Sequence, residues 1–243
     1  MVPFSVSVCV PAFNEAGNVE VLVRDCVRVL GEAGVEYELI VVDDGSRDAT
    51  PAVLAALAAE LPAFRVITHA ANAGYGKTLR DAWAAATKDY VFYTDGDRQF
   101  DMGELAGLLP LLDGRRAVVG YRVARAEGAL RRFTSWWYNA FVRLVFGLRL
   151  RDIDCSFKFL PRRAVQALDL KADKFFIDTE LMLKLAAAGV PVVERGVRHL
   201  PRAYGRSTVS AGHILTTLRE VAALRREMKK SRGHKGPGGM LED

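Results

Sequence analysis

The chain has 243 residues, of which 50% are hydrophobic and 26% are charged, and its formal net charge is +5. This length and composition predict one large globular domain and exclude an intrinsically disordered or fibrous protein. No run of 18 or more apolar residues occurs, and the three cysteines are odd in number and lack the spacing of metal ligands. We therefore expect a cytoplasmic protein with no signal peptide, no membrane-spanning helix and no disulfide framework.

The positive charge is concentrated in two later segments. Residues 113–151 carry a net charge of +7 and residues 195–235 carry +9, so the rest of the chain carries −11. Basic segments indicate an anionic partner such as phosphate, anionic lipid or nucleic acid. Nucleic acid is not expected, because these segments contain no nucleic-acid-binding motif and the carboxylate-rich remainder would repel it.

Segments with the patterns of strands and helices alternate along the chain. Apolar residues between positions 19 and 30, for example, recur at the three- and four-residue spacing of a helix. The predicted strands are residues 4–10, 38–42, 65–69, 90–94, 116–120, 157–160 and 190–198. The predicted helices are residues 19–30, 50–61, 77–86, 103–112, 131–147, 162–168, 178–188 and 211–230. Thr50 is the expected N-cap of the second helix.

This alternation predicts right-handed βαβ crossovers and an α/β fold, with a mostly parallel sheet flanked by helices. We expect one domain over residues 1–210, then a basic amphipathic helix at 211–230 and a disordered tail at 231–243. Ligands of such sheets bind beyond the carboxyl ends of the strands. Polar motifs follow four of the predicted strands, so we expect these motifs to share one edge of the sheet. They are residues 14–15, 43–46, 72–77 and 95–97.

The motif at residues 95–97 ends a short apolar strand. Asp95 and Asp97 are separated only by Gly96, and two carboxylates so close at the end of a buried strand repel each other. A cation would remove this repulsion, and oxygen ligands suit Mg²⁺ or Mn²⁺, which would hold the phosphates of a nucleotide. Gly96 permits a tight turn, and Gln99 offers a neutral oxygen. The alternative is a polar turn without a ligand.

Two further motifs also have an alternative interpretation. Asp43 and Asp44 could hydrogen-bond the ribose or base of a nucleotide, or they could simply form a β-turn. Residues 71–78 nearly match the phosphate-binding loop of an NTPase, with Ala71 in place of the first glycine. An NTPase would leave residues 11–15 and 43–44 without a role, and its loop follows an early strand instead of the third.

The ordered set of motifs resembles the inverting family 2 glycosyltransferases. The shared motifs are residues 11–15 (Pro-Ala-Phe-Asn-Glu), 43–46 (Asp-Asp-Gly-Ser), 72–77 (Asn-Ala-Gly-Tyr-Gly-Lys) and 95–99 (Asp-Gly-Asp-Arg-Gln). Later segments look like those of the polyprenyl-phosphate (dolichyl-phosphate) sugar transferases of that family. These segments are residues 120–122, 131–135, 154–158 and 202–207. The resemblance covers about residues 4–210.

The resemblance implies a GT-A fold and a nucleotide-sugar donor, a GDP- or UDP-hexose, bound with Mg²⁺ or Mn²⁺. The candidate nucleotide-binding residues are Pro11, Ala12, Asn14, Glu15, Asp43, Asp44, Lys77, Asp95, Gly96 and Asp97. The candidate metal ligands are Asp95, Asp97 and Gln99. The residues implied to hold the acceptor phosphate and the donor phosphates are Arg122, Arg131, Ser135 and Arg202.

The identity of the acceptor decides whether the reaction needs a base. A phosphate acceptor is already an anion, so arginines that donate paired hydrogen bonds need only to position it. A saccharide hydroxyl would require a general base, for which Asp178 and Glu180 are the candidates. The alternative for both acids is that they stabilise the N-terminus of their helix.

The helix at residues 131–147 is unusually aromatic and is surrounded by arginines. Its aromatic residues include Phe133, Trp136, Trp137 and Phe141. It could lie on a lipid surface, or it could pack in the core. The helix at 211–230 could lie on anionic lipid, form a dimer or pack on the domain.

We therefore expect an enzyme that transfers mannose or glucose from GDP- or UDP-sugar to a polyprenyl phosphate, with Asp97 at the centre of catalysis. We expect it to contact an anionic membrane surface peripherally, at the cytoplasmic face. A homo-oligomer and a separate membrane-anchor partner both stay open. The alternatives are transfer to a saccharide hydroxyl and a non-catalytic module that binds nucleotide or nucleic acid.

Overall fold

The structure is a computed structural model that describes residues 3–123, 129–174, 176–202, 204, 221 and 224–226; it does not describe the side chains of residues 129–133. The chain forms two compact units, Met1–Arg206 and Ser207–Asp243. The domain boundary at residue 210 stays a prediction. The helix predicted at 211–230 and the tail at 231–243 lie outside the described residues, apart from Val221 and residues 224–226.

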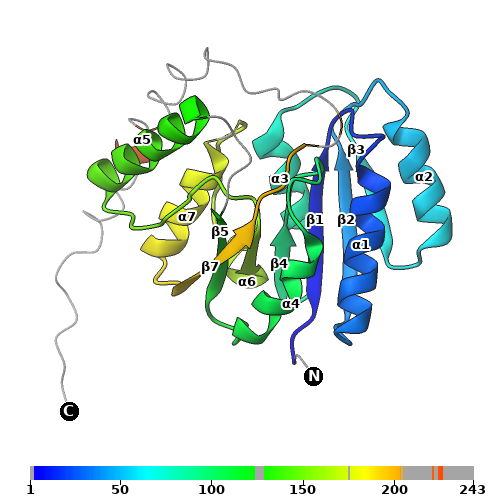
Figure 1. The fold of residues 1–243 in the computed structure, drawn as a ribbon, viewed down its shortest axis with the longest axis horizontal. Helices are drawn as coiled ribbons and strands as arrows, with labels where there is room; N and C mark the ends of the chain where they lie inside the picture. Colours follow the sequence, from blue (N-terminus) through cyan, green and yellow to red (C-terminus); the bar gives the residue numbers. More distant parts are fainter. Residues whose placement is uncertain are drawn as a thin grey trace. The chain divides into compact units, whose positions relative to one another are not determined.

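The described residues of the first unit form a seven-stranded mixed sheet, with the spatial order β3-β2-β1-β4-β6-β5-β7 (Figure 1). The strands are β1 (Val6–Ala12), β2 (Tyr37–Asp43), β3 (Phe64–Thr68), β4 (Tyr90–Tyr93), β5 (Ala117–Val123), β6 (Lys158–Pro161) and β7 (Val192–Arg198). Within this part of the chain β6 alone runs antiparallel to its neighbours, β4 and β5. The predicted α/β fold with a mostly parallel sheet is therefore confirmed.

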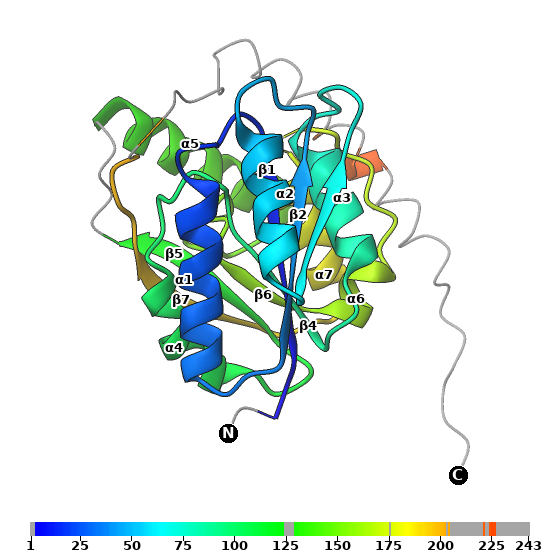
Figure 2. The same ribbon diagram turned by 90° about the vertical axis from the view of Figure 1, so that its right-hand side faces the viewer.

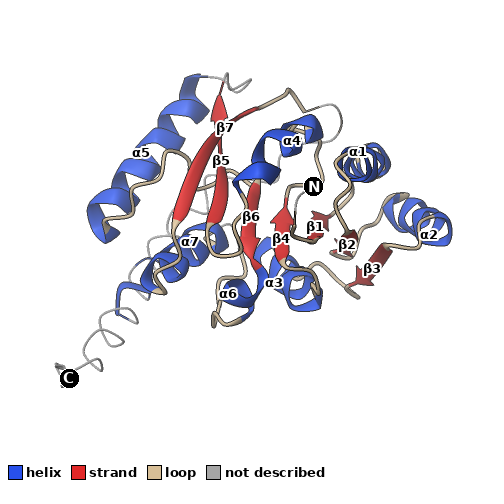
Figure 3. Ribbon diagram, turned by 90° about the horizontal axis from the view of Figure 1, so that it is seen from below, coloured by secondary structure: helices blue, strands red, loops and turns tan. Residues whose placement is uncertain are grey.

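Helices cover both faces of this sheet (Figure 3). The helices are α1 (Val19–Glu32), α2 (Thr50–Glu60), α3 (Tyr75–Ala85), α4 (Leu105–Leu108), α5 (Ala129–Phe146), α6 (Arg162–Gln166) and α7 (Ile177–Ala187). One face carries α1, α2 and α4, and the other carries α3, α6 and α7. Helices α1 and α2 pack side by side (Figure 2). Among the described residues, no helix combines the length and the apolar character that crossing a membrane requires.

The continuous helix predicted at residues 103–112 is wrong. The segment instead forms a 3₁₀ turn, η1 (Met102–Glu104), then the short α4, then a second 3₁₀ turn, η2 (Leu109–Leu111). Pro110 lies at the start of η2, and a proline in a helix removes a backbone N–H donor and clashes with the preceding turn. This proline explains why one regular helix does not form.

The core follows from the apolar strands. All seven residues of β1 and all four of β4 are buried, as expected for strands that helices cover on both faces. The predicted apolar stripe of α1 packs against them, with Leu22, Cys26 and Leu30 buried. Because β1 runs parallel to both β2 and β4, the carboxyl ends of these three strands meet at one edge of the sheet.

The antiparallel strand β6 adds a further loop to that edge. Its first residue, Lys158, pairs with Tyr93, the last residue of β4. The loop that precedes β6 therefore lies beside the loops that follow the parallel strands. A parallel β6 would have placed this loop at the opposite edge.

Two glycines allow the loops at this edge to pack backbone against backbone. A Cβ at Gly96 would lie 2.9 Å from the carbonyl oxygen of Pro11. A Cβ at Gly76 would overlap the carbonyl oxygen of Ala172. The Gly76 N–H also donates to the Asp173 carbonyl oxygen over 2.9 Å. The start of α3 is thus held directly against the 172–173 segment.

We predict that Gly76→Ala lowers the free energy of unfolding by about 1–3 kcal/mol, because the added methyl group forces the two backbones apart. Gly31 is the matched control, since a Cβ there meets nothing within 4 Å. Because Gly31 lies in α1, Gly31→Ala should raise stability by about 0.5–1 kcal/mol. Urea unfolding measures both changes, and equal effects of the two substitutions would contradict the packing described here.

Candidate active site

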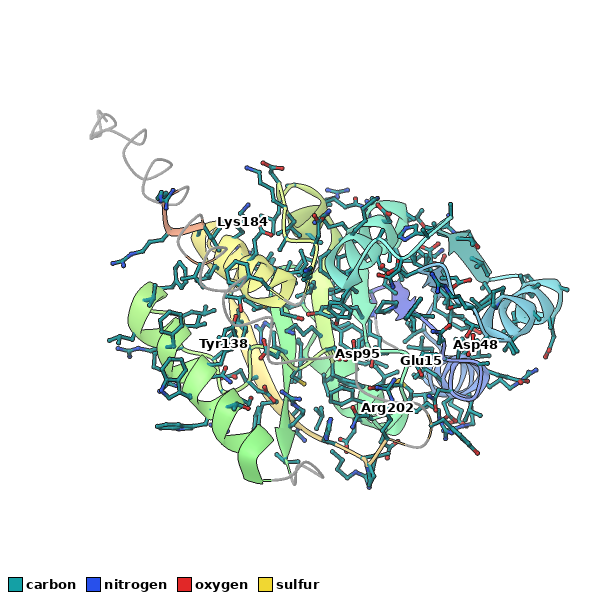
Figure 4. All side chains as sticks on the ribbon, turned by 90° about the horizontal axis from the view of Figure 1, so that it is seen from above. Glu15, Asp48, Asp95, Tyr138, Lys184 and Arg202 are labelled. Atoms are coloured by element: carbon teal, nitrogen blue, oxygen red, sulfur yellow. The ribbon has the colours of Figure 1, made fainter. Side chains whose placement is uncertain are left out.

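Several loops bring polar side chains to the carboxyl edge of the sheet, and Figure 4 looks onto this edge. Glu15 comes from the loop after β1, and Asp95 comes from the loop after β4. Arg202 comes from the segment after β7 and donates a hydrogen bond to Glu15 (Figure 4). The edge therefore gathers residues that are far apart in the sequence, as the alternating strands predicted.

The loops after β1 and β2 are tied together by hydrogen bonds. The Asn14 N–H donates to Ser46 Oγ over 2.9 Å, and the Arg47 N–H donates to Asn14 Oδ1 over 2.8 Å. Asn14 has a φ of 57°, a conformation that asparagine tolerates better than most residues. Pro11 and Ala12 lie in β1, and the Asp44 N–H donates to the Ala12 carbonyl oxygen over 2.8 Å.

Thr50 is not the N-cap of α2, contrary to the prediction; Ala49 occupies that position. The Thr50 hydroxyl instead donates to Asp48 Oδ1 over 2.6 Å and accepts the Glu15 N–H over 2.9 Å. The threonine therefore links α2 to the loop that carries Glu15, because its hydroxyl can donate one hydrogen bond and accept another.

Asp44 is buried and shapes the loop at residues 72–77. Its Oδ1 accepts the Ala73 N–H over 2.7 Å and its Oδ2 accepts the Gly74 N–H over 3.0 Å. Its Oδ1 also lies 2.7 Å from Nδ1 of His69. These contacts argue against an NTPase phosphate loop, because its backbone N–H groups already have protein acceptors.

Asp43 and Lys77, from these two motifs, also contact protein groups. Asp43 Oδ1 accepts the Ser46 N–H over 3.0 Å, as in the alternative β-turn interpretation. Lys77 Nζ donates to Asp81 Oδ2 over 2.7 Å, and that same oxygen lies 2.8 Å from Nε2 of His69. The His69 ring therefore lies between two carboxylates, a contact that no sequence spacing indicated.

Asp95 is held on both sides by hydroxyl groups. Tyr75 Oη donates to its Oδ1 over 2.8 Å, and Ser156 Oγ donates to its Oδ2 over 2.6 Å. Burial, and then the negative charge of Asp97, raise the pKa of Asp95 from 3.8 to about 6. The effect of Asp97 has the direction expected from the carboxylate repulsion that the sequence predicts.

Asp97 and Gln99 form a tight turn after Asp95. Asp97 Oδ1 accepts the Gln99 N–H over 3.1 Å, and Gln99 Nε2 donates to the Leu200 carbonyl oxygen over 3.4 Å. Within the described residues, no three side chains of His, Cys, Asp or Glu converge as a metal site. A pair of carboxylates alone suits Mg²⁺ or Mn²⁺ that takes its other ligands from substrate phosphates and water.

Arg202 joins the loops after β1 and β4. It donates to Glu15 Oε1, and its Nη1 lies 3.7 Å from Asp97 Oδ2. Its Nε donates to the Tyr204 carbonyl oxygen over 2.9 Å. Burial raises the pKa of Glu15, although Asn18 and Arg202 oppose this rise. A cationic group therefore already lies between two carboxylates of this edge.

The residues implied to hold the acceptor are only partly described. Arg122 Nε and Nη2 donate to the two oxygens of Asp152 over 2.7 and 2.8 Å. Ser135 Oγ is buried and has no hydrogen-bond partner among the described residues. The side chain of Arg131 lies outside the described residues, as do residues 205–207 of the last motif.

Asp154 begins the 154–158 motif, but the sequence assigns it no role of its own; the charges of Arg122 and Lys158 act on its carboxyl group. Burial, and then the charges of Asp178 and Asp152, raise its pKa from 3.8 to about 7, although Arg122 and Lys158 oppose the rise. A group with such a pKa can exchange a proton near neutral pH. Its position between carboxylates could not be inferred from the sequence order.

Asp178 and Glu180 are buried in the first turn of α7, and both are bound by protein groups. Asp178 Oδ1 accepts hydrogen bonds from Tyr93 and from Lys158, the latter over 2.8 Å. Glu180 Oε2 accepts the Ala172 N–H over 2.8 Å, and its Oε1 accepts from Lys184 over 2.8 Å. These contacts give both acids structural roles.

We predict that Asp154→Asn makes the stability less dependent on pH. The folded chain binds more protons than the unfolded chain between pH 3.8 and about 7, so wild-type stability falls as the pH rises through this window. The variant should gain about 3 kcal/mol relative to wild type between pH 4.5 and pH 8. Urea unfolding at both pH values measures this gain, and an unchanged difference would refute it.

Comparison with known proteins identifies the family of this sequence. Residues 7–168 match the profile of the family described as Glycosyl transferase family 2. The chain is 35% identical over 207 residues to the glycosyltransferase AglD of Haloferax volcanii, covering 81% of this chain and 33% of that protein. It is 28% identical over 230 residues to an undecaprenyl-phosphate 4-deoxy-4-formamido-L-arabinose transferase of Pseudomonas aeruginosa, covering 88% and 62%. It thus spans between a third and about three fifths of these relatives.

Solved structures share the fold. Glucosyl-3-phosphoglycerate synthase from Mycobacterium tuberculosis, in complex with phosphoglyceric acid, superposes with a TM-score of 0.68 at 22% identity, covering 93% of this chain and 80% of that one. The same synthase in complex with Mn²⁺, UDP-glucose and phosphoglyceric acid gives 0.67, covering 91% and 78%. These likenesses confirm the expected GT-A fold. Because the family profile matches well over half of its residues, the chain belongs to glycosyl transferase family 2.

Proposed function

We propose that this glycosyltransferase moves a hexose from a UDP- or GDP-sugar to a polyprenyl phosphate at the cytoplasmic face of the membrane, with Mg²⁺ or Mn²⁺ bound. One observation carries the proposal: carboxylates from the loops after β1 and β4 meet the arginine after β7 at a single edge of the sheet. Glu15, Asp97 and Arg202 supply these groups.

Asp95, Asp97 and Gln99 would hold the divalent ion. The mutual repulsion of the two carboxylates supports this assignment, because a cation relieves it. The residues of the loops after β1 and β2 would hold the nucleoside. When bound, the ion would neutralise the charge that develops on the leaving diphosphate. The complex of the mycobacterial synthase with Mn²⁺ and UDP-glucose supports such a donor.

The arginines would orient the phosphates. Arg122 is held by two hydrogen bonds to Asp152, so its guanidinium plane is fixed before a substrate arrives. Arg202 lies next to the candidate metal ligands and would turn from Glu15 and Asp97 toward donor phosphate. Neither arginine needs to move a proton, because a phosphate acceptor is already an anion.

The engagement of Asp178 and Glu180 also supports a phosphate acceptor. Asp178 accepts a hydrogen bond from the buried Lys158, and Glu180 accepts hydrogen bonds from the partly buried Lys184 and from a backbone N–H group. Transfer to a saccharide hydroxyl stays the second candidate function, and the pKa of Asp154, about 7, favours it. In that reaction Asp154 would be the general base, in place of Asp178 or Glu180.

Helix α5 supports contact with a membrane surface. Trp137 and Leu144 are 56% and 86% exposed, and Arg143 and Arg149 are exposed nearby in the sequence. Tyr138 lies on the same helix, and its hydroxyl is 2.7 Å from that of Thr179 on α7 (Figure 4). Exposed aromatic and aliphatic side chains beside arginines suit the interface of an anionic bilayer.

Sugar transfer to a lipid phosphate tests the proposed reaction directly. With radiolabelled UDP-glucose or GDP-mannose and undecaprenyl phosphate, we expect a lipid-extractable product that EDTA abolishes. Asp97→Ala should lower the rate at least 100-fold, since it removes a metal ligand. Asp101→Ala is the control in the same segment, because the Asp101 carboxylate faces Arg198. No lipid product from either sugar, or full activity of Asp97→Ala, would contradict the proposal.

Binding to lipid vesicles tests the proposed contact between α5 and a membrane surface. The double variant Trp137→Ser/Leu144→Ser should bind anionic vesicles at least tenfold more weakly, because it removes exposed apolar surface. Its transfer to a short-chain, water-soluble polyprenyl phosphate should stay within about twofold of wild type. Val21→Ser, a change at an exposed position of α1, is the control. Unchanged vesicle binding, measured by sedimentation, would show that α5 does not contact lipid.

A further inference from the structure

Lys158 is fully buried at the start of β6, an unusual place for a lysine. Its ammonium group has three N–H donors, and three acceptors surround it. It donates to Tyr93 Oη over 2.7 Å, to Asp178 Oδ1 over 2.8 Å and to the Cys155 carbonyl oxygen. The ammonium group is thus satisfied by the protein alone.

Two of these acceptors lie close in the sequence to Asp95 or to Ser156, which holds it. Tyr93 is the last residue of β4, two positions before Asp95. Cys155 directly precedes Ser156, whose hydroxyl donates to Asp95 Oδ2 over 2.6 Å. Lys158 therefore ties the end of the strand that carries Asp95 to the turn that supplies its hydrogen-bond donor.

Stability alone does not explain this arrangement. A buried ion pair costs desolvation that its attraction often fails to recover, so apolar residues of similar size would stabilise the fold as well or better. An apolar residue could not hold the Cys155 carbonyl oxygen or the Tyr93 hydroxyl. The directional hydrogen bonds of Lys158 are what an apolar core would lose.

We propose that Lys158, paired with Asp178, is a positioning residue for the candidate metal ligand Asp95. It acts through the 155–156 turn by fixing the hydroxyl of Ser156 against the carboxylate. The inference rests on the proposed function for the role of Asp95, but the contact between Ser156 and Asp95 can be tested without it. Asp178 is then a partner of Lys158 and not a base.

The test separates positioning from stability by removing both charges. Lys158→Met leaves Asp178 buried without its partner and should lower the unfolding midpoint strongly. Lys158→Met/Asp178→Leu should recover most of that midpoint, yet bind UDP or GDP with Mn²⁺ at least tenfold more weakly than wild type. In a crystal structure of this double variant, the distance from Ser156 Oγ to Asp95 Oδ2 should exceed 3.5 Å.

Three further variants complete the experiment. Ser156→Ala should weaken Mn²⁺-dependent nucleotide binding at least tenfold alone and less than twofold in the double variant, because both changes remove the same contact. Tyr93→Phe keeps the core volume and should give an intermediate loss of nucleotide affinity. It replaces the double variant in the test if the double variant fails to fold. Lys184→Met breaks the partly buried ion pair with Glu180 and should reduce stability without changing nucleotide affinity.

A stable double variant with wild-type nucleotide affinity and an intact contact between Ser156 and Asp95 would overturn the inference. If it does not fold, wild-type nucleotide affinity in Tyr93→Phe would do the same. Wild-type protein that binds no nucleotide with Mn²⁺ would instead overturn the proposed function. In that case the distance between Ser156 and Asp95 in the variant structure still decides whether Lys158 positions Asp95.

Discussion

Carboxylates crowd one edge of the sheet, and the need to compensate their charge organises the surrounding structure. Burial, and then the negative charge of Asp97, raise the pKa of Asp95 to about 6, and the charge of Asp95 also acts on Glu15. The guanidinium of Arg202 and the hydroxyl groups of Tyr75 and Ser156 compensate these charges by donating hydrogen bonds to the carboxylates. Carboxylates so close together favour a bound cation, and the guanidinium beside them favours a bound phosphate.

The antiparallel strand β6 is the topological device that makes this compensation possible. The parallel strands bring only the loops that follow them to the carboxyl edge, whereas β6 brings the loop that precedes it. That loop supplies Ser156 and, at its end, Lys158. It also brings Asp152 to Arg122, so one reversed strand connects the candidate metal ligands to the predicted acceptor side.

Local sequence patterns predict the fold and the location of the central site. Parallel strands end at the same edge of a sheet, so the loops that follow them come together there. The apolar run before Asp95, the helical stripe before Leu30 and the polar turn after each strand were sufficient for this. The sequence could not show that Asp44 binds the backbone of residues 73–74, or that Glu180 binds that of residue 172. Such contacts depend on how loops distant in sequence pack, as do those of His69 and Ser156. Lys158 had one signal, a charge at the start of an apolar strand, but its partners came from two other elements.

The account depends on a divalent ion joining these carboxylates to a nucleotide diphosphate. Calorimetric titration of the wild-type protein with UDP and with GDP, in the presence of Mn²⁺ and again in the presence of EDTA, tests this most directly. The account predicts one site per chain for one of the two nucleotides and an affinity at least tenfold higher with the ion. Equal affinity in EDTA, or no binding of either nucleotide, would contradict it.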